Sequence, residues 1–358
     1  MNGKTQLRKE KVKMRKNIKD LALYLKDIIV PESHEIYPVK PILEDFIDDI
    51  IIRTGVNEFR IFLIKLFDLL IAEGDAYDNY KKIPHEYENR ITLSVNFPFL
   101  HNVRTIMMNL GIQGVFKENK DYLFCNSNLF DPRVSISKSI EALKFLIVCG
   151  LEFDGVNLDD KKTLLETNVI KVSYPKNPQM LIGLKVMAIA EVRYGSLVKQ
   201  DVFLRCDYRV LINEAIDIKT IIKEIIKPLS IDLQNFVLSL HQHSINKGYK
   251  TIVEIKGFWI YIKYLYKRKE IWGLNTSLNN GLHINIKATN MPKYPAIIET
   301  FPKIMKDVIS KGFGCGRKIS SIGHCNGGCR GMTMQLDNYI LDLSDDIIKW
   351  FDAEIVFC

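Results

Sequence analysis

The chain has 358 residues, of which 47% are hydrophobic, 26% are charged and 12 are prolines. This composition excludes a disordered chain and is typical of a globular protein with roughly two or three domains. No uncharged apolar run reaches the ~18 residues that span a bilayer, so we expect no membrane partner. The formal net charge of +8 at pH 7 is concentrated in residues 1–20, which hold eight basic and two acidic side chains.

We interpret residues 1–56 as a basic N-terminal helical segment. Its first 20 residues fit either a solvated helix face or a surface that binds phosphate backbones, so nucleic-acid binding there is one alternative function. Lys26 and Asp27 interrupt the apolar run that follows, which argues against a signal peptide. Because the seven cysteines are few and odd in number, we expect a reducing, cytoplasmic location.

Residues 57–215 are predicted to form two tandem α/β units. A helix over 41–52 is expected at the end of the N-terminal segment, and after a short break the first unit begins with a helix over 58–74. A strand from Ile91, a helix from Phe99 to Gly111 and a hairpin over 114–125 complete this unit.

The same order of elements recurs in the second unit. Helices are expected over 139–150 and 177–192, and strands over 170–174 and 201–206. Ile91 aligns with Ile170, so the two units are either an internal repeat or two segments that share only their periodicity.

Residues 225–358 are predicted to form a C-terminal α+β module. A helix over 232–248 precedes four strand-like runs, for which an antiparallel meander is the simplest arrangement. A helical stripe that restarts at Pro302, a strand over 332–336 and a helix capped by Ser344 follow. The predicted fold class is therefore α+β, made of tandem helix–strand modules, of which the last is a meander packed by helices with a Cys-rich loop.

The Cys-rich loop, residues 312–331, concentrates metal-ligand chemistry. It contains Cys315, Cys325 and Cys329, with His324 beside them. Thiolates and imidazoles bind zinc, and a structural zinc site needs four ligands. Since adjacent residues rarely bind one ion, we favour Cys358 or His283 over His324 as the fourth ligand. A structural zinc ion is the predicted cofactor.

Two other interpretations of the loop stay open. The neighbouring cations Arg317, Lys318 and Arg330 would lower a thiol pKa, which favours a thiol-dependent enzyme or redox protein that uses Cys325 or Cys329. Alternatively, the cysteines are small residues packed in a tight turn.

Two further patterns are weaker. His241 and His243 lie two apart in a predicted helix, so they point to different sides and are not expected to bind one metal. The aromatic and basic run at 259–272 fits a surface that stacks bases. However, apolar residues stand at both odd and even positions, which favours a sheet that is covered on both faces.

Three stretches, NPQMLIGLKVMAIA, FLRCDYR and GHCNGGCRG, resemble those of an uncharacterised protein family of clostridial and related Firmicutes bacteria, over most of the chain. The C-terminal module alone resembles a widespread bacterial domain of unknown function. Neither resemblance implies an activity. We therefore expect a binding or interaction protein without catalysis, with a structural zinc site at Cys315, Cys325, Cys329 and His324 or a remote ligand.

Overall fold

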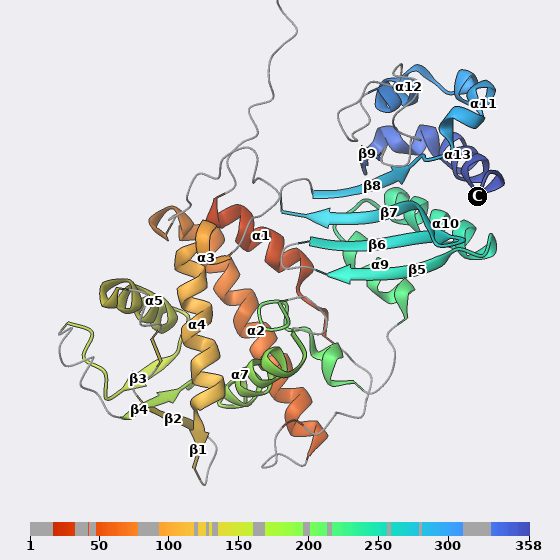
Figure 1. Cartoon of the computed structure of the whole chain (residues 1–358). Helices are drawn as coiled ribbons and strands as arrows, with labels where there is room; N and C mark the ends of the chain where they lie inside the picture. Colours follow the sequence, from red (N-terminus) through yellow and green to blue (C-terminus); the bar gives the residue numbers. More distant parts are fainter. Residues whose placement is uncertain are drawn as a thin grey trace, which may run out of the picture. The chain divides into compact units, whose positions relative to one another are not determined.

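The computed structural model has helices and two antiparallel sheets, and so confirms the α+β fold class (Figure 1). The chain forms two compact units, Met1–Lys26 with Ile61–Leu181, and Asp27–Arg60 with Ile182–Cys358. Within the described residues no helix is long and apolar enough to cross a membrane. The structure describes residues 17–32, 42, 48–77, 93–117, 121–126, 129–130, 135–159, 169–195, 201–212, 217–255, 259–278, 281–310 and 331–358.

The first two described helices of the chain are α1 and α2. Helix α1 covers Ile18–Ile28, and α2 covers Asp49–Glu73 without interruption, so the expected break near residue 55 is wrong. Gly55 lies inside α2, and its backbone is in close contact with Gly183. A Cβ added to Gly183 would lie 1.9 Å from the Gly55 carbonyl oxygen, which leaves no room for a side chain at Gly183.

The first unit has a four-stranded sheet in the order β1-β2-β4-β3. The expected hairpin is confirmed, since its two strands pair antiparallel, and the expected helix after Phe99 is confirmed as well. The unit's helices and strands are η1 (Gly74–Tyr77), α3 (Leu93–Asn96), α4 (Pro98–Gln113), β1 (Val115–Phe116), β2 (Tyr122–Asn126), α5 (Ile136–Val148), β3 (Glu152–Asp154) and β4 (Val169–Ser173).

Two predicted strands are wrong. Residues 93–96 form a helical turn, which the Phe97 amide closes by donating to the Leu93 carbonyl at 2.9 Å. Residues 201–206 form turns after α7 (Gln179–Ala190) and a π-helical turn (Glu191–Gly195). There the Glu191 carboxylate accepts from the amides of Val202, at 2.6 Å, and Phe203, at 3.0 Å. These amides are therefore not available to a strand ladder. The repeat hypothesis aligns the stretch from Ile91 with that from Ile170, and the two differ, because residues 93–96 are helical whereas Val169–Ser173 is the strand β4.

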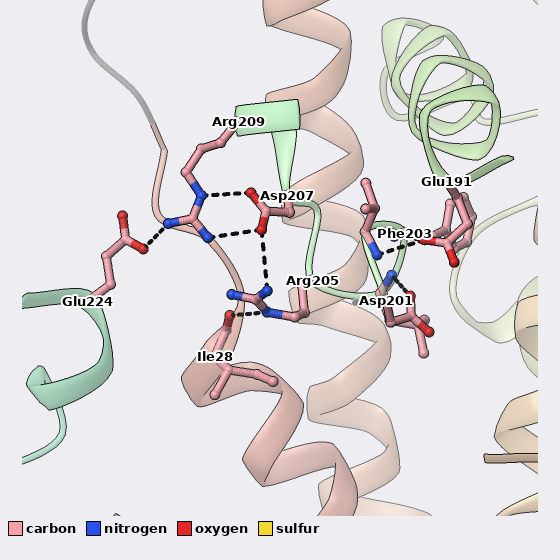
Figure 2. A network of polar contacts seen from close by, with 10 residues as sticks. Ile28, Glu191, Asp201, Phe203, Arg205, Asp207, Arg209 and Glu224 are labelled. Carbon is pink, nitrogen blue, oxygen red and sulfur yellow. Dashed lines mark hydrogen bonds and ion pairs between the residues drawn. The ribbon is translucent and has the colours of Figure 1, made fainter. Parts of the chain in front are cut away.

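A buried ionic network follows these turns in the second unit (Figure 2). The Arg209 guanidinium donates to both oxygens of Asp207, at 2.6 and 2.9 Å, and also to Glu224. Arg205 donates to Asp207 at 3.2 Å and to the Ile28 carbonyl at 3.4 Å. The network thus joins chain segments that are far apart in sequence.

Charge pairing governs the protonation of Asp207. Burial alone would raise the pKa of its carboxyl group, but Arg209 and then Arg205 outweigh burial and hold this pKa at about 2. A buried anion between two guanidinium groups stabilises the fold only as long as all the partners remain.

Replacement of Asp207 should reveal this dependence. We expect Asp207→Asn to lower the free energy of unfolding at pH 7 by about 3–5 kcal/mol, because two buried cations lose their partner. The depressed pKa means that the contribution is complete above pH ~4 and is lost as pH falls toward 2, so the difference between wild type and variant should narrow by about 2 kcal/mol over that range. Urea unfolding of both proteins at several pH values measures this difference in the free energy of unfolding. A difference that stays constant with pH would contradict the ionic assignment.

The predicted C-terminal meander is confirmed as part of a five-stranded sheet in the order β5-β6-β7-β8-β9, with every pair antiparallel. Ser344, the expected cap residue, is instead the first residue of the last helix, and Leu343 occupies the cap position. The second unit contains, from Tyr208 on, η4 (Tyr208–Leu211), α9 (Ile218–Ile226), α10 (Ile231–Asn246), β5 (Lys250–Ile255), β6 (Trp259–Tyr266), β7 (Lys269–Ser277), β8 (Gly281–Lys287), η5 (Met291–Lys293), α11 (Pro295–Thr300), α12 (Lys303–Ser310), β9 (Gly331–Gln335), η6 (Asn338–Leu343) and α13 (Ser344–Val356).

Helices cover one face of this sheet, and Figure 1 shows α9 and α10 behind it. At the centre, the Trp272 ring stacks between Tyr264, with ring centroids 3.9 Å apart, and Phe351, with centroids 5.3 Å apart. The Trp272 indole N–H donates to Ser244 Oγ at 2.9 Å, so its polar atom is satisfied. The aromatic run at 259–272 therefore contributes mainly to the core.

Candidate functional site: the polar face of the C-terminal sheet

The predicted loop ligands Cys315, His324, Cys325 and Cys329 lie outside the described residues. In the part of the chain that the structure describes, no group of three or more His, Cys, Asp and Glu side chains is placed to hold a metal. The zinc site therefore stays a prediction. Its two remote candidate ligands, Cys358 and His283, are both described.

Cys358 already has two polar contacts. Its thiol lies 3.2 Å from the Glu354 carbonyl oxygen, to which it donates, and Asn290 Nδ2 donates to its sulfur at 3.4 Å. Asn290 and Tyr294 also donate to the buried Glu354 carboxylate. The polar groups of this cluster thus hydrogen-bond with one another, which indicates a structural role at the end of α13.

His283 is different. Its side chain is 3% exposed, and Nδ1 lies 3.1 Å from the Gly281 carbonyl oxygen. Since a carbonyl only accepts, Nδ1 carries the proton and Nε2 presents a lone pair. Burial lowers the pKa of His283, which keeps the ring neutral. Nε2 has no hydrogen-bond partner among the described residues.

Strand alternation places His283 on the sheet face opposite the helices. The register aligns Tyr261, Asn275, His283 and Gln335 across four strands, and their neighbours Ile262, Leu274, Ile284 and Met334 form the parallel row in the core. We call the opposite surface the polar face; its residues are Glu254, Tyr261, Lys263, Asn275, His283, Asn285, Thr333 and Gln335.

Several side chains of the polar face are paired. Lys263 forms an ion pair with Glu254 at 2.6 Å, and Thr333 Oγ1 donates to Asn285 Oδ1 at 2.8 Å. The Tyr261 phenol donates to the Glu270 carboxylate. These contacts hold much of the polar face in one arrangement.

Asn275 stands out because its side chain is 6% exposed and its buried Oδ1 has no hydrogen-bond partner in the described part of the chain. A buried acceptor without a donor costs about 1–3 kcal/mol. Asn275 is directly opposite His283 in the strand register, and such pairs have Cβ atoms about 4.5–5.5 Å apart. Two electron-pair donors thus lie side by side without a described group to satisfy them. This arrangement suits a cation or a hydrogen-bond donor.

The sequence contained a signal for this face that the search for motifs missed. In the strands after residue 269, Asn275, His283 and Asn285 alternate with apolar residues, which is typical of a sheet with one solvated or ligand-facing side.

His241 and His243 point to different sides of α10, as their spacing predicts. His241 Nδ1 contacts the Tyr264 phenol at 2.9 Å, whereas His243 Nε2 contacts Asp352 at 3.0 Å.

Two of the described thiols, those of Cys149 and Cys206, are poor nucleophiles. Burial raises the pKa of Cys149 to about 12, and burial also raises the pKa of Cys206. A reactive thiol of the kind expected for Cys325 or Cys329 would need a more polar environment than either of these has.

No protein-family model, curated protein or solved structure matches the chain. The function is therefore inferred from the chemistry of its own residues.

Gly273 is essential to the shape of the polar face. A Cβ at this position would lie 2.1 Å from Cε2 of Tyr261, so the tyrosine ring lies against the bare glycine backbone. We expect Gly273→Ala to lower the free energy of unfolding by about 1–3 kcal/mol through overpacking. In a Tyr261→Ala background the same change should cost less, because the clashing ring is gone and only the Ile262 carbonyl oxygen, 2.9 Å from the added Cβ, stays too close. Denaturant unfolding of all four proteins measures the coupling, and equal costs in both backgrounds would argue against the ring contact.

Proposed function

We propose that this chain is a binding or interaction protein whose C-terminal module is fixed by a structural zinc ion. The ligands are Cys315, Cys325 and Cys329 of the loop, with His283 as the fourth. The observation that carries the proposal is Nε2 of the buried, neutral His283, for which no described residue is a hydrogen-bond partner.

The geometry of His283 supports this role. A histidine that binds zinc through one ring nitrogen commonly donates its other N–H to a carbonyl or carboxylate, which fixes the ring and its tautomer. The contact from Nδ1 to the Gly281 carbonyl oxygen has this form. Cys358 is a weaker candidate because its sulfur already has both a donor and an acceptor.

Chain connectivity also supports it. The loop ends at Gly331, the first residue of β9, and β9 pairs with β8, the strand that carries His283. Gly331 is opposite Lys287, four residues along β8 from His283, a separation of roughly 13 Å along the strand. A loop of this length spans such a distance readily.

A zinc ion with four protein ligands has no open position for substrate, so it stabilises structure instead of performing chemistry. On this basis we favour binding over catalysis. Asn275 is opposite the proposed ligand in the strand register and is buried with it, so this part of the polar face belongs to the proposed zinc site.

Elemental analysis tests the zinc proposal. Protein purified without a metal-affinity tag should contain about one zinc ion per chain. We expect His283→Ala to lower the zinc content to the level of Cys325→Ser, whereas Cys358→Ser and His243→Ala retain it. His243 is the matched control, since it is a histidine of the same module that contacts only Asp352 in the described part of the chain. Far-UV circular dichroism checks that each variant is folded.

Other outcomes of these measurements would change the ligand set or contradict the zinc site. Zinc that is kept by His283→Ala and lost by Cys358→Ser would make Cys358 the fourth ligand. A zinc-free wild type in which all three loop thiols titrate freely would contradict the metal site. A low thiol pKa of Cys325 or Cys329 in alkylation kinetics would then favour the thiol-dependent enzyme.

A further inference from the structure

The sheet of the first unit has one covered face and one open face. On β2, Leu123 and Cys125 are buried, whereas Tyr122 and Phe124 are only partly covered. The thiol of Cys125 lies 3.9 Å from the Leu110 carbonyl of α4, so α4 covers the face that Cys125 shares with Leu123. Tyr122 and Phe124 are on the other face because side chains alternate along a strand.

Two lysines lie over these two rings. The Lys117 ammonium is 4.3 Å from the centroid of the Phe124 ring, and the Lys171 ammonium is 3.9 Å from that of Tyr122. Neither ammonium has an ion-pair partner among the described residues. We call Lys117, Tyr122, Phe124 and Lys171 the aromatic–lysine face.

Carboxylates are present at one edge of the same sheet. Asp154 of β3 is opposite Lys171 in the register, and Glu152 accepts from Ser173 Oγ at 3.1 Å. Because the strand order is β1-β2-β4-β3, both acidic residues are on the edge strand beyond β4. The half of the sheet formed by β1, β2 and β4 therefore combines flat aromatic surface with positive charge.

We propose that the aromatic–lysine face binds single-stranded nucleic acid. Tyr122 and Phe124 are two residues apart on one strand, about 7 Å, which leaves room for one base on each ring. Base faces are accessible only in single strands, and stacking on aromatic side chains is tolerant of sequence. The two ammonium groups lie where they can turn from the rings to the flanking phosphates. This site is separate from the zinc site, and its test does not depend on zinc.

Fluorescence anisotropy with labelled oligo(dT) and oligo(U), and a duplex of equal length, tests the proposal on the full chain. We expect single strands to bind more tightly than the duplex. The double variant Tyr122→Ala, Phe124→Ala should weaken binding about tenfold or more. Lys117→Gln with Lys171→Gln should make the slope of log Kd against log salt concentration shallower by about one.

Lys144→Gln is the matched control, since Lys144 is an exposed lysine of α5 in the same unit, and it should leave the affinity unchanged. Removal of residues 1–16, which keeps α1 complete and removes seven of the eight basic side chains of residues 1–20, separates this site from the basic N-terminus. Binding that survives the truncation and is lost in the aromatic variant supports the proposal. Binding that is lost only on truncation, equal affinity for the duplex, or absence of binding at low salt would overturn it. Circular dichroism confirms that the aromatic variant is folded.

Discussion

The alternation of side chains along five paired strands is the constraint on which the C-terminal module depends. The row of Ile262, Leu274, Ile284 and Met334 faces the helices, and so the adjacent row from Tyr261 to Gln335 must face the other way. A slip of one residue in any strand would exchange the two rows and bury the polar side chains in the core. The stacked rings around Trp272 prevent such a slip, because an indole of this size fits only one register. The position of His283 and Asn275 is thus a consequence of core packing.

Much of the fold followed from local patterns. The helices at 98–113, 136–148 and 231–246, the meander and the last strand were all predictable, since each has a periodicity that its own residues establish. The turns at 201–206 were not. The residue types of this stretch predict a strand. The Glu191 carboxylate, however, accepts hydrogen bonds from the Val202 and Phe203 amides, which a strand would use for pairing. The uninterrupted α2 was missed for a related reason, because Gly55 is a packing residue next to Gly183 and a lone sequence cannot show this.

The candidate site was predictable only in part. His283 could be named as a remote ligand, but its free nitrogen follows from the position of the Gly281 carbonyl, which depends on the turn before β8. Asn275 is not part of any sequence motif. It becomes a candidate only because it lies opposite His283 on the neighbouring strand, and the register between strands is set by long-range packing. Chemistry that is concentrated in one loop, such as the three cysteines, is visible in a sequence, whereas chemistry assembled across strands is visible only in the fold.

The ionic network around Asp207 has a consequence for how the chain folds during synthesis. Arg205 contacts the carbonyl of Ile28, 177 residues earlier, and Arg209 contacts Glu224. The segment Asp27–Arg60 belongs to a compact unit whose other part begins at Ile182. It therefore leaves the ribosome long before its partners exist, and at about 5–20 residues per second the wait is on the order of ten seconds. During this interval its apolar side chains cannot pack against the residues from Ile182 onward, so the second unit forms its core only late in synthesis.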